Sequence, residues 1–145
     1  MLNQLPVAEL LDKIGEKTPA PASGAATALT GALAAALAEL SARFAADDAG
    51  IARARELASE LVQLGDEDAA AYAAYLADQN EQTHAETIRV PEEIARRADE
   101  VAELAERAAG KLKSSVAGDA RASAELARAA ARVARGLALL NRAGS

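Results

Sequence analysis

Asp68 is the residue whose position in the sequence points most directly to chemistry. Apolar residues recur at steps of three and four around it, which marks one face of a helix, and Asp68 falls on that face midway between Leu64 and Tyr72. A carboxylate on a core-facing stripe costs free energy unless it is paired or hydrogen-bonded. Burial would also raise its pKa, as a general acid working near neutral pH requires. The alternative is that the stripe rotates there and leaves Asp68 at a wet edge, beside the solvated Asp66 and Glu67.

The second candidate is a loop of small residues that leads into a helix. Between Thr18 and Phe44 the chain passes Pro19 and Pro21 and then becomes a helix made almost wholly of Ala and Leu. The first amides of a helix have no intrahelical partner, and the helix dipole makes this end slightly positive. Small side chains at residues 21–25 would let an anionic or carbonyl-bearing ligand approach those amides. The alternative is a capped helix start that binds nothing.

Five helical segments have to position these groups. Apolar spacing, prolines and capping residues predict helices over residues 2–14, 23–45, 49–78 and 90–110, and from residue 119 toward the C-terminus. Asp47 and Asp48 precede the third helix, and either can cap it. The polar stretch 80–87, which holds the single His84, is predicted to be a loop or a frayed helix end. The fourth helix is expected to open at Val90-Pro91, because Pro suits the first helical turn.

The last helix is expected to turn its larger apolar residues inward and its arginines toward solvent. The residues predicted to face in are Ser123, Leu126, Ala130, Val133, Leu137 and Leu140. Asp119 suits an N-cap or a first-turn acid, which is the alternative to a role in binding. In the preceding link, Lys111 and Lys113 could hold an anion or simply be solvated.

The composition restricts the fold class to an all-α bundle of about five antiparallel helices with long central helices. Apolar residues make up 51% of the chain but aromatic residues only 2%, so Ala and Leu carry the burial, as helices favour. A chain of 145 residues is expected to form a single domain over residues 1–145. An Ala-rich core buries little area per residue, and we therefore expect a homodimer interface that adds to it.

Several classes of function are excluded by what the chain contains. It has no cysteine and one histidine, so we expect no disulfide, no thiol nucleophile and no metal site. A net charge of −6 argues against nucleic acid as a partner. The Ala/Leu helix meets charges too early for a membrane span, and no run resembles a signal peptide. We expect a cytoplasmic protein that does not bind a membrane.

Three ordered blocks resemble the cyclodeaminase domain of formiminotransferase-cyclodeaminase and its relatives, the bacterial methenyltetrahydrofolate cyclohydrolases. The family's P-x-P-G-G-G-S loop before a small-residue helix is matched by Pro19 to Ala25. Its D-x-D-A-x-A-[FY] motif within a long helix is matched by the segment from Asp66 to Tyr72. Its V-P block, its N-x-x-x-x-S-D segment and its terminal Asn are matched by Val90-Pro91, Gly118-Asp119 and Asn141.

The chain departs from the family pattern at several polar positions. Of the three loop glycines only Gly24 remains, and Ala25 stands at the loop serine. Lys113 and Gly118 replace the Asn and Ser of the N-x-x-x-x-S-D segment, and Leu137 replaces an Asn of the last helix. The stretch from Leu76 to Arg89 is also shorter than in typical members. This pattern fits an altered substrate, or a protein that kept the fold and lost the chemistry.

The resemblance implies an all-helical homodimer that binds a reduced folate between helices or subunits. The implied reaction is ring closure of 5-formimidoyltetrahydrofolate with loss of ammonia, or hydration of the methenyl ring, with no cofactor beyond the tetrahydrofolate substrate. In this reading Asp68, with Asp66, is the catalytic acid–base group. The loop Pro21, Ala22, Ser23, Gly24 and Ala25 binds the ligand through backbone amides, and Asp119 orients the pterin. We further expect Lys111, Lys113 and Arg121 to meet the glutamate tail. The alternative is a non-catalytic helical homodimer, an interaction or scaffold protein on a degenerate cyclodeaminase fold.

Overall fold

The protein is all-helical, as the composition predicts. A computed structural model describes residues 1–144, and the described chain contains no strand. Its elements are the 3₁₀ helix η1 (Leu2–Gln4) and the helices α1 (Val7–Gly15), α2 (Ser23–Phe44), α3 (Asp48–Ala77), α4 (Glu81–Lys111) and α5 (Ala117–Ala143).

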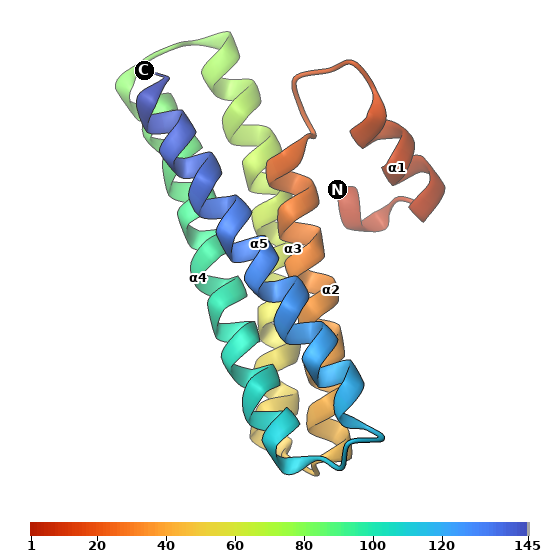
Figure 1. Ribbon diagram of the computed structural model, residues 1–145. Helices are drawn as coiled ribbons and strands as arrows, with labels where there is room; N and C mark the ends of the chain where they lie inside the picture. Colours follow the sequence, from red (N-terminus) through yellow and green to blue (C-terminus); the bar gives the residue numbers. More distant parts are fainter. Residues whose placement is uncertain (145) are drawn as a thin grey trace.

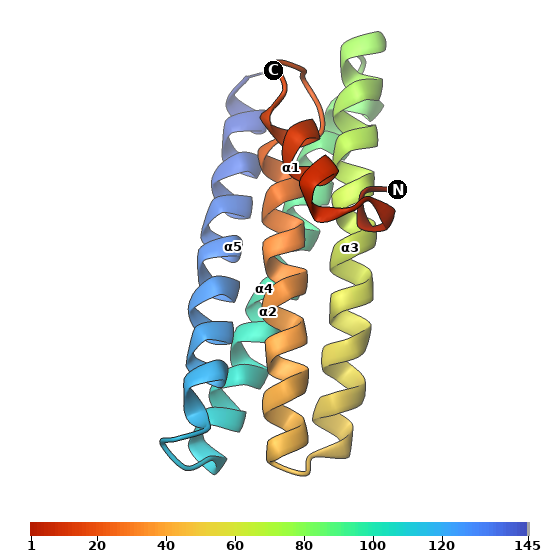
Figure 2. The same ribbon diagram turned by 90° about the vertical axis from the view of Figure 1, so that its right-hand side faces the viewer.

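The four long helices α2 to α5 form an antiparallel up-and-down bundle (Figure 1). Each packs against its neighbours in the sequence, and α5 closes the bundle by packing against α2. The turned view shows α5, α2 and α3 side by side, with α4 behind α2 (Figure 2). Short connections between the helices favour this arrangement. The N-terminal end of α2 and the C-terminal end of α5 therefore lie at the same end of the bundle.

The core of the bundle is built mainly from alanine. Ala28, Ala35 and Ala38 of α2 and Ala127 and Ala134 of α5 are all buried. Small side chains let two helix backbones approach closely. Where α2 and α5 meet, the buried Ser123 donates a hydrogen bond to the carbonyl oxygen of Ala34, 2.6 Å away. Leucine fills the core chiefly on α3, where Leu57 and Leu61 are completely buried.

The N-terminal segment differs from the single helix predicted over residues 2–14. η1 ends at Gln4 and α1 begins at Val7, with Pro6 in extended backbone between them. Pro6 has no N–H to donate, so the chain breaks there and restarts. α1 buries none of its residues and stands off the side of the bundle beside α2 (Figure 1).

The prediction of a loop or a frayed helix end over residues 80–87 is wrong, because residues 81–87 form the first turns of α4. α4 begins at Glu81, ten residues before Pro91, which lies inside the helix. The start is fixed by a capping box, in which the Asn80 side chain accepts from Thr83 N and the Thr83 hydroxyl accepts from Asn80 N. Two satisfied amides stabilise a helix start, and tertiary contacts hold the helix together through Pro91. His84 thus lies on a helix.

The start of α5 also differs slightly from its predicted position. The helix begins at Ala117, Val116 occupies the N-cap position without a side-chain hydrogen bond, and Asp119 lies in the first turn. At α3 the capping prediction is confirmed, because the Asp47 side chain accepts a hydrogen bond from Gly50 N at 3.0 Å.

The prediction for the inward face of α5 is only partly correct. Ser123 and Ala130 are buried, but Leu126, Val133 and Leu140 are exposed. The close approach of the helices selects alanine for the inner positions of α5 and leaves these larger side chains outside. Similarly, the apolar stripe of α3 is buried up to Leu64 and emerges from the core beyond it, since Tyr72 and Leu76 are exposed.

Within the described residues, α2 alone is long and apolar enough to cross a membrane by length and composition. More than half of its most apolar window is buried inside the bundle. A core helix of a folded bundle has this property as well.

Candidate active site at one end of the bundle

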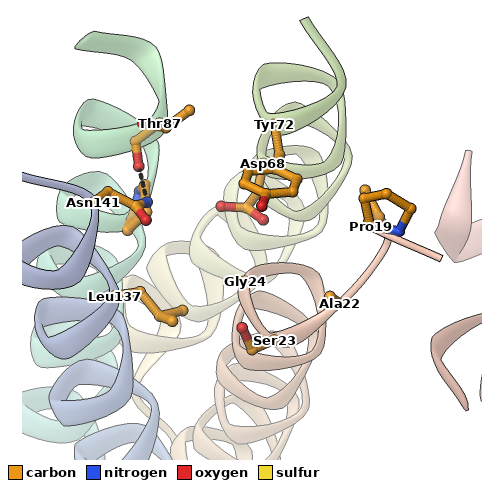
Figure 3. A pocket seen from close by; sticks show the side chains of 11 residues that line it. Pro19, Ala22, Ser23, Gly24, Asp68, Tyr72, Thr87, Leu137 and Asn141 are labelled. Atoms are coloured by element: carbon orange, nitrogen blue, oxygen red, sulfur yellow. Dashed lines mark hydrogen bonds between the residues drawn. The ribbon is translucent and has the colours of Figure 1, made fainter. Parts of the chain in front are cut away.

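A cleft of about 240 Å³ opens where the N-terminal end of α2 meets the C-terminal end of α5. The loop before α2 supplies one rim, α3 and α2 supply one wall, and α4 and α5 supply the opposite wall (Figure 3). Its lining residues are Pro19, Ala20, Ala22, Ser23, Gly24, Asp68, Tyr72, Thr87, Pro91, Leu137 and Asn141.

The floor of the cleft is the uncapped N-terminus of α2. Ala22 is the N-cap residue, and its methyl side chain offers no oxygen to cap the helix. The first intrahelical hydrogen bond runs from Ala26 N to the Ala22 carbonyl, so the amides of Ser23, Gly24 and Ala25 precede the helical ladder. These amides and the positive end of the helix dipole attract a ligand that carries an acceptor or a partial negative charge.

Asp68 extends from α3 over this helix end. A Cβ atom placed on Gly24 would lie closer than 3.0 Å to three atoms of the Asp68 carboxyl group, so the carboxyl group occupies the space that a side chain there would need. Within residues 1–144 Asp68 forms no hydrogen bond or ion pair. Burial raises the pKa of Asp68 to about 6, which poises this carboxyl group to gain or lose a proton near neutral pH.

The opposite wall carries a polar group that is held in place by its neighbours. Asn141 of α5 donates a hydrogen bond from Nδ2 to the backbone carbonyl of Thr87, 2.6 Å away, and Thr87 is buried in α4 (Figure 3). The His84 ring nitrogen Nε2 lies 2.8 Å from the Asn141 backbone carbonyl oxygen. The cleft thus has Asp68 on one side, Asn141 on the other and helix amides between them.

The structure brings together some of the residues predicted to form the site. Asp68, Ala22, Ser23 and Gly24 line the cleft, whereas Pro21 is not a lining residue and Ala25 is completely buried. Asp66 points elsewhere, because its carboxylate accepts a hydrogen bond from Leu2 N at 2.9 Å. Asp66 thereby ties η1 to α3 and does not line the cleft.

Lys113 and Asp119 lie at the other end of the bundle. Both belong to the region where α4 passes into α5, and the cleft lies where α5 ends. The length of α2, 22 residues or about 33 Å, separates the two ends. Within one chain these two residues do not reach the cleft.

Most of the α4–α5 wall is not predicted by residue types and spacing. Thr87 falls in the stretch predicted to be a loop or a frayed helix end. Leu137 is predicted to face inward on the last helix and to replace an Asn of the family pattern, but not to line a site. Asn141 and Pro91 are parts of motifs without a predicted place in the site. Two features of the sequence could have indicated this wall. Asn141 is a polar residue at the end of the apolar stripe of the last helix, and Pro91 lies in a segment with helical spacing of its apolar residues. Across the described residues, no cluster of three or more acidic or histidine side chains could hold a metal ion.

A family model described as formiminotransferase-cyclodeaminase matches residues 6–143 of this sequence. The chain belongs to the formiminotransferase-cyclodeaminase family. The family resemblance predicted from the three ordered blocks is thereby confirmed. A search of curated proteins found no match.

A solved structure similar to this member of the formiminotransferase-cyclodeaminase family is formiminotetrahydrofolate cyclodeaminase from Thermotoga maritima. The TM-score is 0.93 at 24% sequence identity, and the match covers 99% of this chain and 81% of the other. At this level of identity the likeness establishes the fold, and the all-helical bundle is common to both proteins.

Proposed function

We propose that this protein is an enzyme of folate-linked one-carbon chemistry, a formimidoyltetrahydrofolate cyclodeaminase or a methenyltetrahydrofolate cyclohydrolase. The observation that carries the proposal is the Asp68 carboxyl group, unpartnered and half-buried over the open N-terminus of α2, with its pKa raised to about 6. Membership of the formiminotransferase-cyclodeaminase family supports the substrate class.

Both reactions pass through a carbon bonded to two nitrogens, and both need one group to move a proton. In ring closure, N10 of the folate attacks the carbon of the protonated formimidoyl group, and the C=N electron pair moves to the imino nitrogen, which becomes an amino group. N10 then loses its proton, and the amino group takes up one proton and leaves as ammonia, which gives the methenyl cation. The Asp68 carboxylate takes the N10 proton and returns it to the leaving nitrogen. In ring hydration, the same carboxylate takes a proton from the attacking water. A group with a pKa near the working pH serves both directions of transfer.

The remaining lining residues suit a flat, partly apolar ring with hydrogen-bonding edges. The cleft volume of about 240 Å³ lies below the range of roughly 300–1,000 Å³ typical of sites that enclose a drug-sized ligand. We infer that the cleft takes the bicyclic ring and the reacting carbon, and that the rest of the folate extends outside. The amides at the start of α2 would bind a carbonyl oxygen of the ring.

A thermal shift assay with 5-formyltetrahydrofolate, a stable stand-in for the substrates, tests this function. A ligand that binds only the native state raises the melting temperature by mass action. We expect a rise that depends on ligand concentration and that is smaller in Ser23→Pro, which removes one of the three amides at the start of α2. No shift at saturating ligand would contradict the folate proposal and favour a non-catalytic scaffold.

We also propose that the protein forms a homodimer through an apolar face shared by α2 and α5. We define this α2/α5 face as Leu33, Leu40, Phe44, Leu126, Val133 and Leu140, all of which are exposed. On α2 the charged Glu39 lies toward Arg55 of α3, so the uncharged side is turned toward α5.

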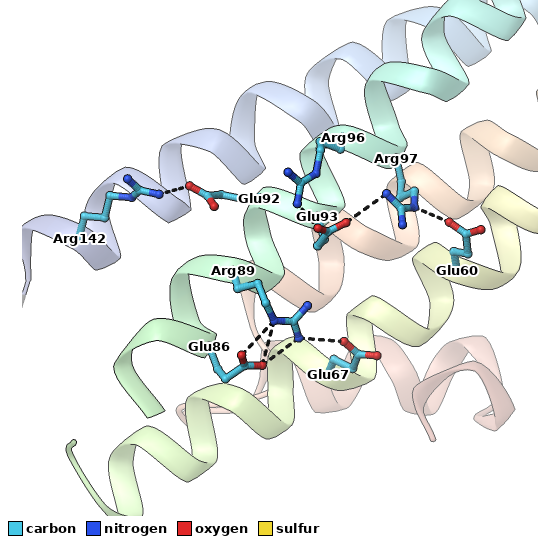
Figure 4. Close-up of polar contacts among 9 residues, drawn as sticks. All are labelled: Glu60, Glu67, Glu86, Arg89, Glu92, Glu93, Arg96, Arg97 and Arg142. Carbon is cyan, nitrogen blue, oxygen red and sulfur yellow. Dashed lines mark hydrogen bonds and ion pairs between the residues drawn. The ribbon is translucent and has the colours of Figure 1, made fainter. Parts of the chain in front are cut away.

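On α5 the charged side is likewise turned away from this face. Arg128, Arg135 and Arg142 pair with Glu106, Asp99 and Glu92 of α4. The outer side of α3 and α4 is covered by further ion pairs, such as those of Arg89 and Arg97 (Figure 4). The outer side of α3 and α4 is therefore strongly charged, whereas the α2/α5 face as defined contains no charged residue.

A second copy of this chain is the partner that this face fits best. A two-fold axis pairs a patch with itself, which an uncharged patch permits without like-charge repulsion. The face extends about 21 Å along α5, and a standard interface of about 800 Å² per partner measures about 28 Å across. The α2/α5 face is thus large enough to form the apolar centre of such an interface.

An antiparallel pairing would also give Asp119 and Lys113 access to a cleft. Asp119 precedes Leu126, Val133 and Leu140 at intervals of seven residues, so it continues the exposed stripe of α5 toward the far end of the bundle. With the two-fold axis near the middle of α5, the far end of one copy lies beside the cleft of the other. We propose that Asp119 and Lys113 serve the site across this interface. The proposal places the protein in the cytoplasm, where reduced folates are available.

A further inference from the structure

Pro91 leaves a backbone carbonyl without its usual helical donor at the wall of the cleft. In an α-helix the amide of residue 91 would donate to the carbonyl of residue 87, four positions earlier. Proline has no N–H, so Pro91 inside α4 cannot satisfy the carbonyl oxygen of Thr87. Thr87 is 5% exposed, and a buried carbonyl without a donor is costly.

The side chain of Asn141 supplies the missing donor from α5. Its Nδ2 donates to the Thr87 carbonyl oxygen at 2.6 Å. The Thr87 hydroxyl group does not take the place of this donor, because it donates its proton to the carbonyl oxygen of His84 at 2.7 Å. The backbone of Asn141 is fixed as well, since its own carbonyl oxygen lies 2.8 Å from Nε2 of His84.

This arrangement fixes which end of the Asn141 amide faces the cleft. A carbonyl oxygen can only accept a hydrogen bond, so the nitrogen of Asn141 must point toward Thr87. The oxygen Oδ1 is then the free end, and Asn141 lines the cleft opposite Asp68 (Figure 3). The cleft therefore presents a neutral acceptor whose orientation is set by a proline on another helix.

We infer that Asn141 is a specificity-determining residue, whose Oδ1 accepts a hydrogen bond from an N–H donor on the edge of the ligand ring. In this inference Pro91 is the positioning residue that fixes the orientation of the Asn141 side chain. This inference rests on the proposed function and names the part of the ligand that Asn141 would recognise by a hydrogen bond. The matching chemical class is a ring with an N–H or amino group at its edge, as in an aminopyrimidine. A ring with only acceptors at that edge would meet an unpaired oxygen and be rejected.

The variant Pro91→Ala tests the positioning role without removing Asn141. The alanine introduced by this substitution has an N–H, which would bond to the Thr87 carbonyl and release the Asn141 amide to rotate. We expect the melting temperature to rise, because a helix-breaking residue is replaced by the best helix former. At the same time we expect the Kd for 5-formyltetrahydrofolate to increase about 3- to 10-fold. A merely structural role for Pro91 would not move stability and affinity in opposite directions.

Because Pro91 also lines the cleft, a double-mutant cycle separates positioning from contact. We expect Asn141→Ala to weaken binding about 10- to 100-fold, and Pro91→Ala to have no further effect on the Kd in the Asn141→Ala background. An undiminished effect of Pro91→Ala in that background would overturn the positioning role. Wild-type affinity in Asn141→Ala would overturn the role of Asn141 in recognition.

A measurement without ligand keeps the inference distinct from the proposed function. The side-chain amide protons of Asn141, observed by NMR in the free protein, are expected to exchange slowly in the wild type and at least about 10-fold faster in Pro91→Ala. Equal exchange rates would contradict the positioning of Asn141 by Pro91. If slow exchange is observed but wild-type protein binds no folate, the proposed function and the ligand named here fail together, and the orientation of Asn141 stands.

Discussion

Gly24 lies directly beneath the carboxyl group of Asp68, so that the backbone of α2 and the side chain from α3 share one small space. Any side chain at position 24 would overlap the carboxyl atoms. The family pattern has three glycines in this loop, and this chain retains only Gly24. Gly24 is therefore the glycine against which the Asp68 carboxyl group packs. The position of the proposed acid–base group therefore depends on the residue type at the start of α2.

The variant Gly24→Ala is expected to disable the site while leaving the fold intact. The added methyl group would push the Asp68 carboxyl group out toward solvent, and a displacement of about 1 Å can cost about 100-fold in rate. The Asp side chain can rotate away, so we expect the free energy of unfolding to change by less than about 1 kcal/mol. Steady-state ring closure and chemical denaturation measure the two effects.

Gly110→Ala is the matched control for that substitution. Gly110 also lies in a helix, but a Cβ atom there would meet no other atom within 4 Å. We expect unchanged activity and a gain in stability of up to about 1 kcal/mol from the better helix former. A comparable loss of activity in both variants would show that the effect at position 24 is not local.

Asp68 is expected to lower the stability of the protein at neutral pH. Its pKa is about 6 in the folded state against an ordinary value of 3.8. Between these values the folded protein holds a proton that the unfolded chain has released, so stability falls as the pH rises from about 4 to 6 and is level above. Asp68→Asn should be more stable than wild type by about 2 kcal/mol at pH 7.5, after allowance for partial solvent exposure.

The same comparison at pH 4 supplies the control for Asp68→Asn. There the wild-type carboxyl group is neutral in the folded state, and the two proteins should have nearly equal free energies of unfolding. A stability difference that does not change between pH 4 and 7.5 would mean that the Asp68 pKa is not raised by burial. Urea denaturation of the two proteins at pH 4 and at pH 7.5 measures their free energies of unfolding.

The pH dependence of turnover should report the same group. In the proposed ring closure and ring hydration, Asp68 would act first as a base, so the carboxylate would be the active form of the free enzyme. We expect kcat/KM to rise with pH to a plateau, with an apparent pKa of about 6. A profile that is flat from pH 5 to 8 would exclude Asp68 as the proton-transfer group.

The dimer proposal predicts that one charge on the α2/α5 face yields a folded monomer. Leu33 is 67% exposed, so Leu33→Glu should leave the melting temperature of the monomeric unit nearly unchanged. A buried carboxylate at the centre of an apolar interface is strongly unfavourable. Sedimentation equilibrium of wild type, Leu33→Glu and the control Ala52→Glu, on the exposed side of α3, measures the effect. An unchanged mass for Leu33→Glu would contradict this interface.

The number and order of the helices follow from sequence patterns, because alanine-rich segments of helical period leave no other fold class. The start of α4 does not follow, since Pro91 looks like a helix opening and the capping box at Asn80 lies ten residues before the expected start. The inner face of α5 is mispredicted for a different reason. Apolar spacing ranks leucine above alanine, whereas close helix packing buries the alanines and leaves Leu126 and Val133 outside.

The candidate site is predictable where a single residue breaks a strong pattern. Asp68 interrupts an apolar stripe, and the small-residue loop precedes a helix start, so both can be identified from the chain alone. Asn141 cannot be identified in this way, because its role depends on a carbonyl oxygen that lacks its helical donor, and the missing donor is due to a proline on another helix. The prediction of Asp66 rests only on its place in the same motif as Asp68, and residues two positions apart on a helix point in different directions.

The most direct test of the central claim is the single-turnover rate of ring closure of 5-formimidoyltetrahydrofolate by wild type and by Asp68→Asn at saturating enzyme. The carboxyl and amide groups have nearly the same shape, so binding of 5-formyltetrahydrofolate should be retained and checked in parallel. The account predicts measurable closure by wild type and a rate at least about 100-fold lower for Asp68→Asn. Equal rates for two proteins that bind the folate equally well would contradict it.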